Sequence, residues 1–239
     1  MEDIAPELYK EIQKLYTESA RADSKLISIV KKAKAGKATQ ADLNVAAERL
    51  GKHASTALKT VLTIDSLPDG KLYWNIAEKT IRPTLEYMNS AINGIALMEK
   101  RSADIKHGVK LALQTTKDQR NRIRDVMTFA TNSVTQPELT NALTDPVITT
   151  VHDFLDEFEQ KNAEIRENAG VKQYVIREYD GVGLHSGACD WCLERAGTWD
   201  YQDAKDNGVF ERHPGCGCTI EVVYEDDLNQ EADYGSVPF

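Results

Sequence analysis

The spacing of apolar positions predicts that residues 1–170 are mainly helical. Thr39 and Asp42 are three residues apart, just before a run of regularly spaced apolar residues. This spacing is typical of a helix start at which each side chain caps the backbone N–H of the other residue. The apolar residues that follow recur at helical intervals. They are Leu43, Leu50, Ala54, Ala57, Leu58 and Val61. We therefore expect an amphipathic helix to begin just after Thr39.

Two further helices are predicted in the middle of this region. The first covers about residues 72–99, where Pro83 predicts a kink or a new first turn because proline has no backbone N–H. The second covers 119–130, with apolar residues again at helical spacing. Before them, the segment 66–70 reads Ser-Leu-Pro-Asp-Gly, which is typical of a turn.

A last helix is predicted between residues 145 and 170. Asp145 followed by Pro146 is typical of an N-cap and a first helical position. Its end is expected at the segment 168–170, Asn-Ala-Gly, since glycine favours the backbone conformation that ends helices.

After Gly170 the period of the pattern changes from helical to alternating. Residues 171–179 predict a strand with both faces partly apolar, and 219–224 predict a second strand. The acidic segment 225–239 is expected to pack poorly. The sequence thus predicts an α+β chain: a helical domain over 1–170, a small antiparallel-sheet domain over 171–224, and a tail.

All four cysteines lie between these two predicted strands. They form the pairs Cys189-x2-Cys192 and Cys216-x-Cys218, with His213 just ahead of the second pair. Two pairs of soft ligands on tight turns are typical of a tetrahedral metal site, most often zinc. Four thiolates fill the coordination shell, so the pattern predicts a structural Zn²⁺ rather than a catalytic one.

Other roles for these residues remain open. His213 could replace one thiolate, donate to the ligands or simply shape the turn, and His185 is a weaker candidate. Disulfides would have to join the two pairs, because Cys-x-Cys cannot easily close on itself. The charged start of the chain lacks an apolar signal segment, which favours a reducing setting and a metal. Redox chemistry at Cys189 and Cys192 is disfavoured, because the motif is not expected to open a helix within a βαβ unit.

Charge separates the two parts of the chain. Positions 172–239 carry 14 acidic and 5 basic residues, whereas the preceding positions carry 24 of each. An acidic ribbon repels phosphates and disfavours nucleic-acid binding there. A basic run does occur in the helical half, and its simplest interpretation is a solvated helix face, although it is also the one place where DNA contact is plausible. It comprises Lys117, Arg120, Arg122 and Arg124.

The cysteine-rich segment resembles the head-morphogenesis domain of tailed-phage minor head proteins, the family named after the F protein of phage Mu. That family commonly has a Cys-x-x-Cys pair, a glycine-containing turn, and His-Pro-x-Cys-Arg-Cys leading into a strand. This chain has Cys189-Asp-Trp-Cys192, then Gly197, then a segment over 213–220 that reads His-Pro-Gly-Cys-Gly-Cys-Thr-Ile. Gly217 stands where the family commonly has a basic residue. The resemblance covers about Val175 to Tyr224.

The resemblance implies a virion component made in the host bacterial cytoplasm and packaged inside the phage head near the portal. It implies a structural protein, acting in head morphogenesis or in genome packaging and ejection. Its expected partners are the portal protein or the major capsid protein, bound through the helical half, with weak contact to packaged DNA. No apolar run is long enough to cross a membrane, so no membrane partner is expected.

We expect no enzymatic activity. None of the five histidines is followed two residues later by glutamate, so the zinc-deaminase signature is missing. The zinc-protease, P-loop and dinucleotide-binding motifs are also missing. The alternative interpretation is a zinc-ribbon binding module of a regulatory or nucleic-acid-associated protein.

Overall fold

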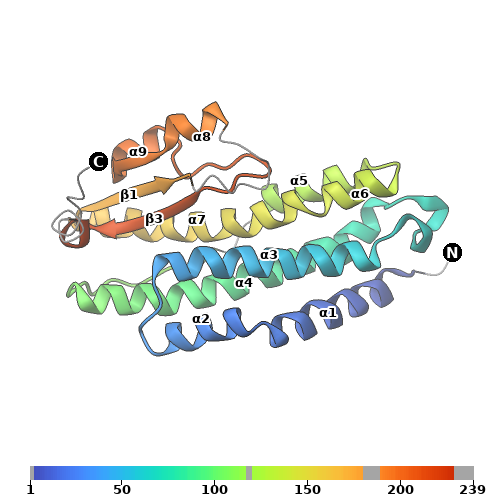
Figure 1. Ribbon diagram of the computed structural model, residues 1–239, viewed down its shortest axis with the longest axis horizontal. Coiled ribbons are helices and arrows are strands. Elements are labelled where there is room, and N and C mark those ends of the chain that lie inside the picture. Colours follow the sequence, from blue (N-terminus) through green and yellow to red (C-terminus); the bar gives the residue numbers. More distant parts are fainter. Residues whose placement is uncertain (1–2, 117–119, 180–188, 229–239) are drawn as a thin grey trace, which may run out of the picture.

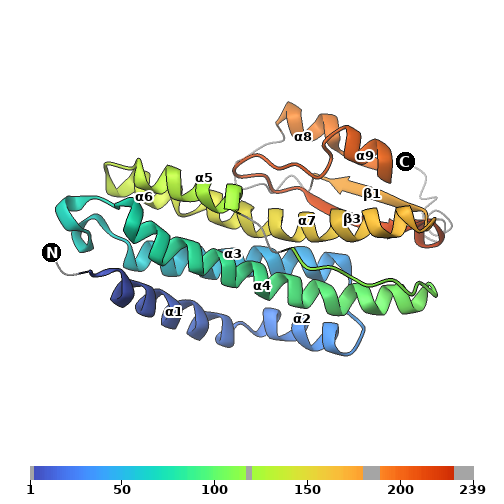
Figure 2. The ribbon, with the colours of Figure 1, turned by 180° about the vertical axis from the view of Figure 1, so that it is seen from behind.

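Helices make up most of the structure. The computed structural model describes residues 3–116, 120–179 and 189–228. The long helices run side by side, and a small sheet lies along α7 on the side away from α1 and α2 (Figures 1 and 2). The helices before the sheet are α1 Ala5–Ala22, α2 Ser24–Lys34, α3 Gln40–Val61, α4 Trp74–Lys106, α5 Arg120–Thr131, α6 Gln136–Ala142 and α7 Asp145–Asn168. This part of the molecule confirms the helical half predicted from the sequence.

Helix α3 lies at the centre of the bundle and packs against α1, α4 and α7. Its contact with α7 is unusually close at Gly51, where an added Cβ would lie 2.8 Å from the Cα of Ile148. Only a residue without a side chain permits that approach. The buried core of the bundle is continuous and includes Leu43, Leu58 and Phe154.

The local signals for helix boundaries are largely confirmed. Thr39 and Asp42 form the predicted reciprocal cap at the start of α3. The segment 64–70 forms two short 3₁₀ turns, as the composition of 66–70 predicts. One detail was wrong: Asp145 is the first residue of α7, with Thr144 as its N-cap. Helix α4 continues through Pro83, so of the two predicted outcomes there the new first turn does not occur. Tertiary packing keeps α4 helical although one backbone hydrogen bond is lost there.

The sheet has three antiparallel strands in the order β2-β1-β3. Strand β1 Gln173–Glu178 pairs with β3 Thr219–Tyr224, and β3 has the predicted bounds. Strand β2 Gly197–Asp200 pairs with the other edge of β1 and was not predicted. The short helices α8 Asp190–Arg195 and α9 Tyr201–Asp206, also not predicted, flank β2 in the chain.

One face of the sheet is buried against α7. Val175 and Val222 lie directly opposite each other on β1 and β3, and both belong to a small apolar cluster. Ala163 of α7 and Tyr201 of α9 belong to the same cluster, which is separate from the bundle core. The cysteines form a third buried cluster. Whether the sheet unit folds as a domain separate from residues 1–170 stays a prediction.

Hydrogen bonds to buried charges also hold the sheet to the bundle. Lys100 of α4 is 3 % exposed, lies 3.1 Å from Glu159 of α7, and donates to the carbonyl oxygen of Val222 at 3.3 Å. Asp104 of α4 accepts hydrogen bonds from Arg166 of α7 and from the hydroxyl of Tyr224. The charges are paired within the bundle, between α4 and α7, and β3 adds a carbonyl oxygen and a hydroxyl that satisfy them further.

The beginning of the acidic tail is packed, contrary to expectation. Asp227 lies 2.7 Å from the ammonium of Lys106 and 2.9 Å from the imidazole of His107, both at the end of α4. Glu225 pairs with Lys172 at 3.0 Å. Opposite charges on α4 therefore hold this segment, while residues 229–239 lie outside the described residues. In the described part of the chain, no helix combines the length and apolarity needed to span a membrane.

Candidate metal centre

Two short segments bring the cysteines together beside the sheet. Cys189 is the N-cap of α8, and its sulfur accepts the backbone N–H of Cys192 at 3.4 Å. Cys216 and Cys218 lie on the turn that leads into β3, where Gly215 has a φ of +79°. Glycine adopts this left-handed conformation without strain, and the turn can therefore direct both thiols to one side.

The predicted ligands form two overlapping groups of donors. Cys189, Cys192 and His213 form one group, and Cys192, Cys216 and Cys218 form the other, with the donor atoms in each group within 4.8 Å of one another. The sulfurs of Cys192 and Cys216 are 3.8 Å apart. Two thiolates on a tetrahedral ion, each about 2.3 Å from the metal, are separated by about this distance. The cluster could therefore hold a metal ion, with Cys192 common to both groups.

The imidazole of His213 is oriented like that of a metal ligand. Its Nδ1 lies 2.9 Å from the carbonyl oxygen of Pro214, which can only accept a hydrogen bond. The proton therefore resides on Nδ1, and Nε2 lies 3.0 Å from the sulfur of Cys192 and 3.2 Å from that of Cys189. The structure thus brings five donors to a site where a tetrahedral ion takes four.

The state and setting of the cysteines disfavour their two alternative roles, disulfide bonding and redox chemistry. All four are free, and the 3.8 Å between the sulfurs of Cys192 and Cys216 is far beyond a disulfide bond of about 2 Å. The Cys-x-x-Cys motif opens a short helix, α8. That helix lies within an antiparallel sheet unit and not within a βαβ unit, as expected. His185 lies outside the described residues.

A buried arginine that the sequence analysis missed lies against the thiols. Arg177 of β1 has no exposed surface and donates from Nη2 to the sulfur of Cys216 at 3.4 Å, with that of Cys192 at 3.9 Å. Its Nη1 donates to the carbonyl oxygens of Val209 and Glu211 at 2.5 and 2.7 Å. A positive charge at this position offsets the negative charge of thiolate ligands and fixes the surrounding loops.

A second buried arginine connects the cysteine turn to the bundle. Arg212 forms an ion pair with both carboxylate oxygens of Asp156 on α7 and donates to the carbonyl oxygen of Cys218 at 2.6 Å. In addition, the backbone N–H of Gly215 donates to the hydroxyl of Thr149 on α7 at 3.0 Å. The turn that carries Cys216 and Cys218 is therefore held by α7 as well as by its own sheet.

The electrostatic environment distinguishes the thiols. A hydrogen bond from Cys218, together with the charges of Arg212 and Arg177, lowers the pKa of Cys216 to about 4. Sharing that proton raises the pKa of Cys218, and burial raises the pKa of Cys192 to about 11. Cys216 is thus the thiol most readily ionised, as a metal ligand must be.

The basic run of α5 does not form one stripe. Arg120, Arg122 and Arg124 are all exposed, and Arg122 lies 3.6 Å from Asp153 of α7. At 100° per residue, Arg122 borders one edge of the apolar face of α5, while Arg120 and Arg124 border the other. Lys117, predicted as part of the same contact, lies outside the described residues.

Together these features define a helical bundle that carries a small antiparallel sheet and a Cys/His cluster able to hold a metal. Comparisons of the chain with known protein families, with curated proteins and with solved structures find no match.

Proposed function

We propose that this chain is a structural minor head protein of a tailed bacteriophage. It acts inside the head near the portal, in head morphogenesis or in genome packaging and ejection. The proposal rests above all on the pattern Cys189-x2-Cys192 followed by His213-Pro-Gly-Cys216-Gly-Cys218 leading into a strand. The fold supports it, because those residues gather at one site beside that strand.

The metal in this proposal is Zn²⁺ in a structural role. Sulfur and imidazole nitrogen are the donors that zinc prefers in closed tetrahedral sites. Cys189, Cys192, Cys216 and Cys218 would hold it, with His213 able to take the place of one thiolate. The bound ion would contribute to stability by joining the α8 segment to the turn before β3.

The helical half is the proposed partner-binding part, with the portal protein or the major capsid protein as partner. The sheet unit carries the excess negative charge and its buried surface faces α7. Most of the large exposed apolar side chains lie in the bundle, among them Tyr73, which precedes α4, and Trp74 and Tyr87 on α4. Exposed aromatic residues are enriched where proteins bind one another.

The alternative, a nucleic-acid-associated zinc module, is less well supported. Around the cysteines, the two arginines that a phosphate would need are buried and bonded: Arg177 to thiols and carbonyl groups, Arg212 to Asp156. The basic side chains of α5 are divided between two edges of the helix, as described above. A ribbon that binds nucleic acid normally presents such side chains together at its surface.

Quantitative mass spectrometry of purified phage particles tests the proposal. We expect the chain in heads, at low copy number relative to the major capsid protein. Heads isolated before genome packaging should be analysed alongside mature particles, because an assembly-time role would leave the chain only in the former. Absence from both, or sequence-specific nanomolar DNA binding by the purified protein, would overturn the proposal in favour of the regulatory alternative.

A further inference from the structure

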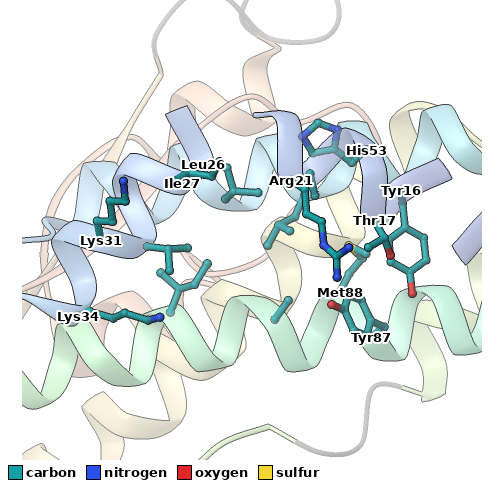
Figure 3. Close-up of a pocket in the computed structure, with 15 residues that line it drawn as sticks. Tyr16, Thr17, Arg21, Leu26, Ile27, Lys31, Lys34, His53, Tyr87 and Met88 are labelled. Carbon is teal, nitrogen blue, oxygen red and sulfur yellow. The ribbon is translucent and has the colours of Figure 1, made fainter. Parts of the chain in front are cut away.

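A groove on the outer side of the bundle lies away from the metal centre, between α1, α2 and α4, with α3 at its base. It has a volume of about 500 Å³. Its inner surface is apolar, with Leu26, Val30, Leu50, Met88 and Ile95 among its lining residues. Figure 3 shows Tyr16 and Tyr87 at one end and Lys31 and Lys34 at the other.

The groove lies beside the junction of α1 and α2, where the helix is interrupted at Asp23. Asp23 is the N-cap of α2, and its carboxylate accepts the backbone N–H groups of Lys25 and Leu26. The same carboxylate lies 2.7 Å from Arg49 and 2.9 Å from His53 of α3. Although burial alone would raise it, these hydrogen bonds lower the pKa of Asp23. This carboxylate at the junction of α1 and α2 is therefore already bonded to groups of α2 and α3.

The rim of the groove is cationic. Arg21, Lys31 and Lys34 line it, and its lining includes no aspartate or glutamate. Among residues 3–116, 120–179 and 189–228, no carboxylate lies within ion-pair distance of any of the three. In a chain with 38 acidic and 29 basic residues, an apolar groove whose lining has three cations and no carboxylate favours an anionic partner.

Two tyrosines close one end of the groove. Tyr16 is 2 % exposed, and its ring lies 5.2 Å from that of Tyr87, which is 51 % exposed. This aromatic pair gives the end of the groove an apolar surface with one exposed ring, the kind of side chain that is enriched where proteins bind one another.

The shape of the groove favours a helix. Along α4 it extends from Tyr87 to Ile95, which is about 12 Å, or roughly two helical turns. Its rim is open, since Tyr87 and Ile27 are 51 % and 37 % exposed, whereas sites for small molecules usually enclose their ligand. Lys31 and Lys34 are one helical turn apart on α2, so carboxylates one turn apart on a partner helix would match them.

We propose that this groove binds an acidic amphipathic helix of a partner protein, with apolar side chains between α2 and α4 and carboxylates against Arg21, Lys31 and Lys34. The proposal deepens the proposed function, since it gives the partner of the helical half a defined chemistry. Helices that lay an apolar face into such a groove are a common mode of recognition between proteins.

Isothermal titration calorimetry on the full-length, metal-loaded chain tests this proposal. The probe is a synthetic amidated peptide of roughly 14 residues, with leucine at one helical face and glutamate on its flanks. We expect binding with a Kd on the order of 10 μM that weakens as salt is added. A peptide with lysine in place of every glutamate should not bind.

Variants locate the binding surface. The double variant Lys31→Glu, Lys34→Glu should weaken peptide binding about tenfold or more. Ala91→Trp, which fills the apolar part of the groove, should abolish it. The matched control is Lys71→Glu, Lys110→Glu, two exposed lysines outside the lining of the groove, which should leave binding unchanged. Circular dichroism establishes that each variant remains folded.

Four results would overturn the proposal: no peptide binding up to about 1 mM, equal binding of the lysine peptide, an equal loss in the control variant, or saturable binding of laurate without binding of the peptide. A dimer in sedimentation analysis that the Lys31, Lys34 double variant dissociates would instead assign the groove to a second copy of the chain. Particle composition is measured separately, so failure of the groove and failure of the proposed function are distinguishable.

Discussion

Arg212, next to the cysteine turn, forms a two-point ion pair with Asp156 in the middle of α7. Arg212 has no exposed side-chain surface, and Asp156 is 3 % exposed. Because Arg212 also donates to the carbonyl oxygen of Cys218, this pair connects the position of a metal-binding cysteine to the helical bundle. Removing one partner would leave the other charge buried and unpaired.

The first prediction concerns this pair. Asp156→Ala should lower the free energy of unfolding by about 3–5 kcal/mol, since the Arg212 charge stays buried without its partner. Urea denaturation with metal present measures the effect. The control is Glu164→Ala, which breaks an exposed pair with Lys205 and should cost less than about 1 kcal/mol. Equal effects of the two variants would contradict the role assigned to the Arg212–Asp156 pair.

The second prediction concerns Arg177, which donates to the sulfurs of the cluster. Arg177→Met should weaken metal binding by about 10- to 100-fold, the usual effect of losing a group that supports metal ligands. Arg177→Lys retains the charge and should restore part of the affinity. Competition with a chromogenic chelator measures both. Unchanged metal affinity in Arg177→Met would show that the arginine serves packing alone.

Local signals in the sequence predicted much of the fold. The reciprocal cap of Thr39 and Asp42 and the bounds of β3 were predictable, because each depends on neighbours in the chain. Strand β2 has four residues, and it exists because it pairs with β1, whose partner residues lie 20 to 26 positions earlier. Such a short segment has no periodicity of its own, so β2 could not be recognised.

The side chains that could hold a metal were predictable as a cluster, but their surroundings were not. The cysteine spacing alone indicates a site. Arg177, in contrast, alternates with apolar residues in β1 like any strand residue, and its thiol partners follow 15 and 39 positions later. Asp156 and Arg212 are 56 positions apart. Charged residues are usually exposed, so from the sequence alone these side chains would be expected at the surface. Only the folded structure shows that they are buried together.

The third prediction concerns pH. Burial raises the pKa of Asp153 to about 7 against the attraction of Arg122 and Arg212, with smaller upward contributions from Asp156 and Cys216. Because the folded-state pKa exceeds the unfolded one, this group stabilises the fold at low pH and loses that effect as pH rises to about 7. As the pH rises from 5.5 to 8, the free energy of unfolding of Asp153→Asn should therefore increase by about 2 kcal/mol relative to that of the wild type.

Denaturation of both proteins at several pH values measures this difference. The range is chosen to keep the thiolates ionised and the metal bound. A difference between wild type and Asp153→Asn that stays constant across the range would contradict the raised pKa.

The fourth prediction concerns DNA. Arg120 and Arg124 lie on one edge of α5. Arg122 lies on the opposite edge, next to Asp153. The three side chains can therefore contact few phosphates at once. Duplex DNA should bind weakly at most, with a logarithmic salt slope of about −2 or shallower. Fluorescence anisotropy at several salt concentrations, with Arg120→Ala, Arg124→Ala as the comparison, measures it. A steep slope that this double variant leaves unchanged would place a DNA site elsewhere.

The fifth prediction separates the possible ligand sets. His213→Ala should retain one zinc with affinity reduced by about 10- to 100-fold, if four thiolates bind the ion and the imidazole supports them. Cys189→Ser should then lose the metal. The opposite pair of results, loss in His213→Ala and retention in Cys189→Ser, would show that the histidine takes the place of Cys189.

The central claim is that Cys189, Cys192, Cys216 and Cys218, with His213 beside them, form a structural zinc site. Native mass spectrometry of the protein purified under reducing conditions tests it most directly. We predict one zinc per chain, and none in Cys192→Ser, which removes the donor common to both groups. A folded wild-type chain without metal, or one whose mass shows bridged cysteines, would contradict the claim.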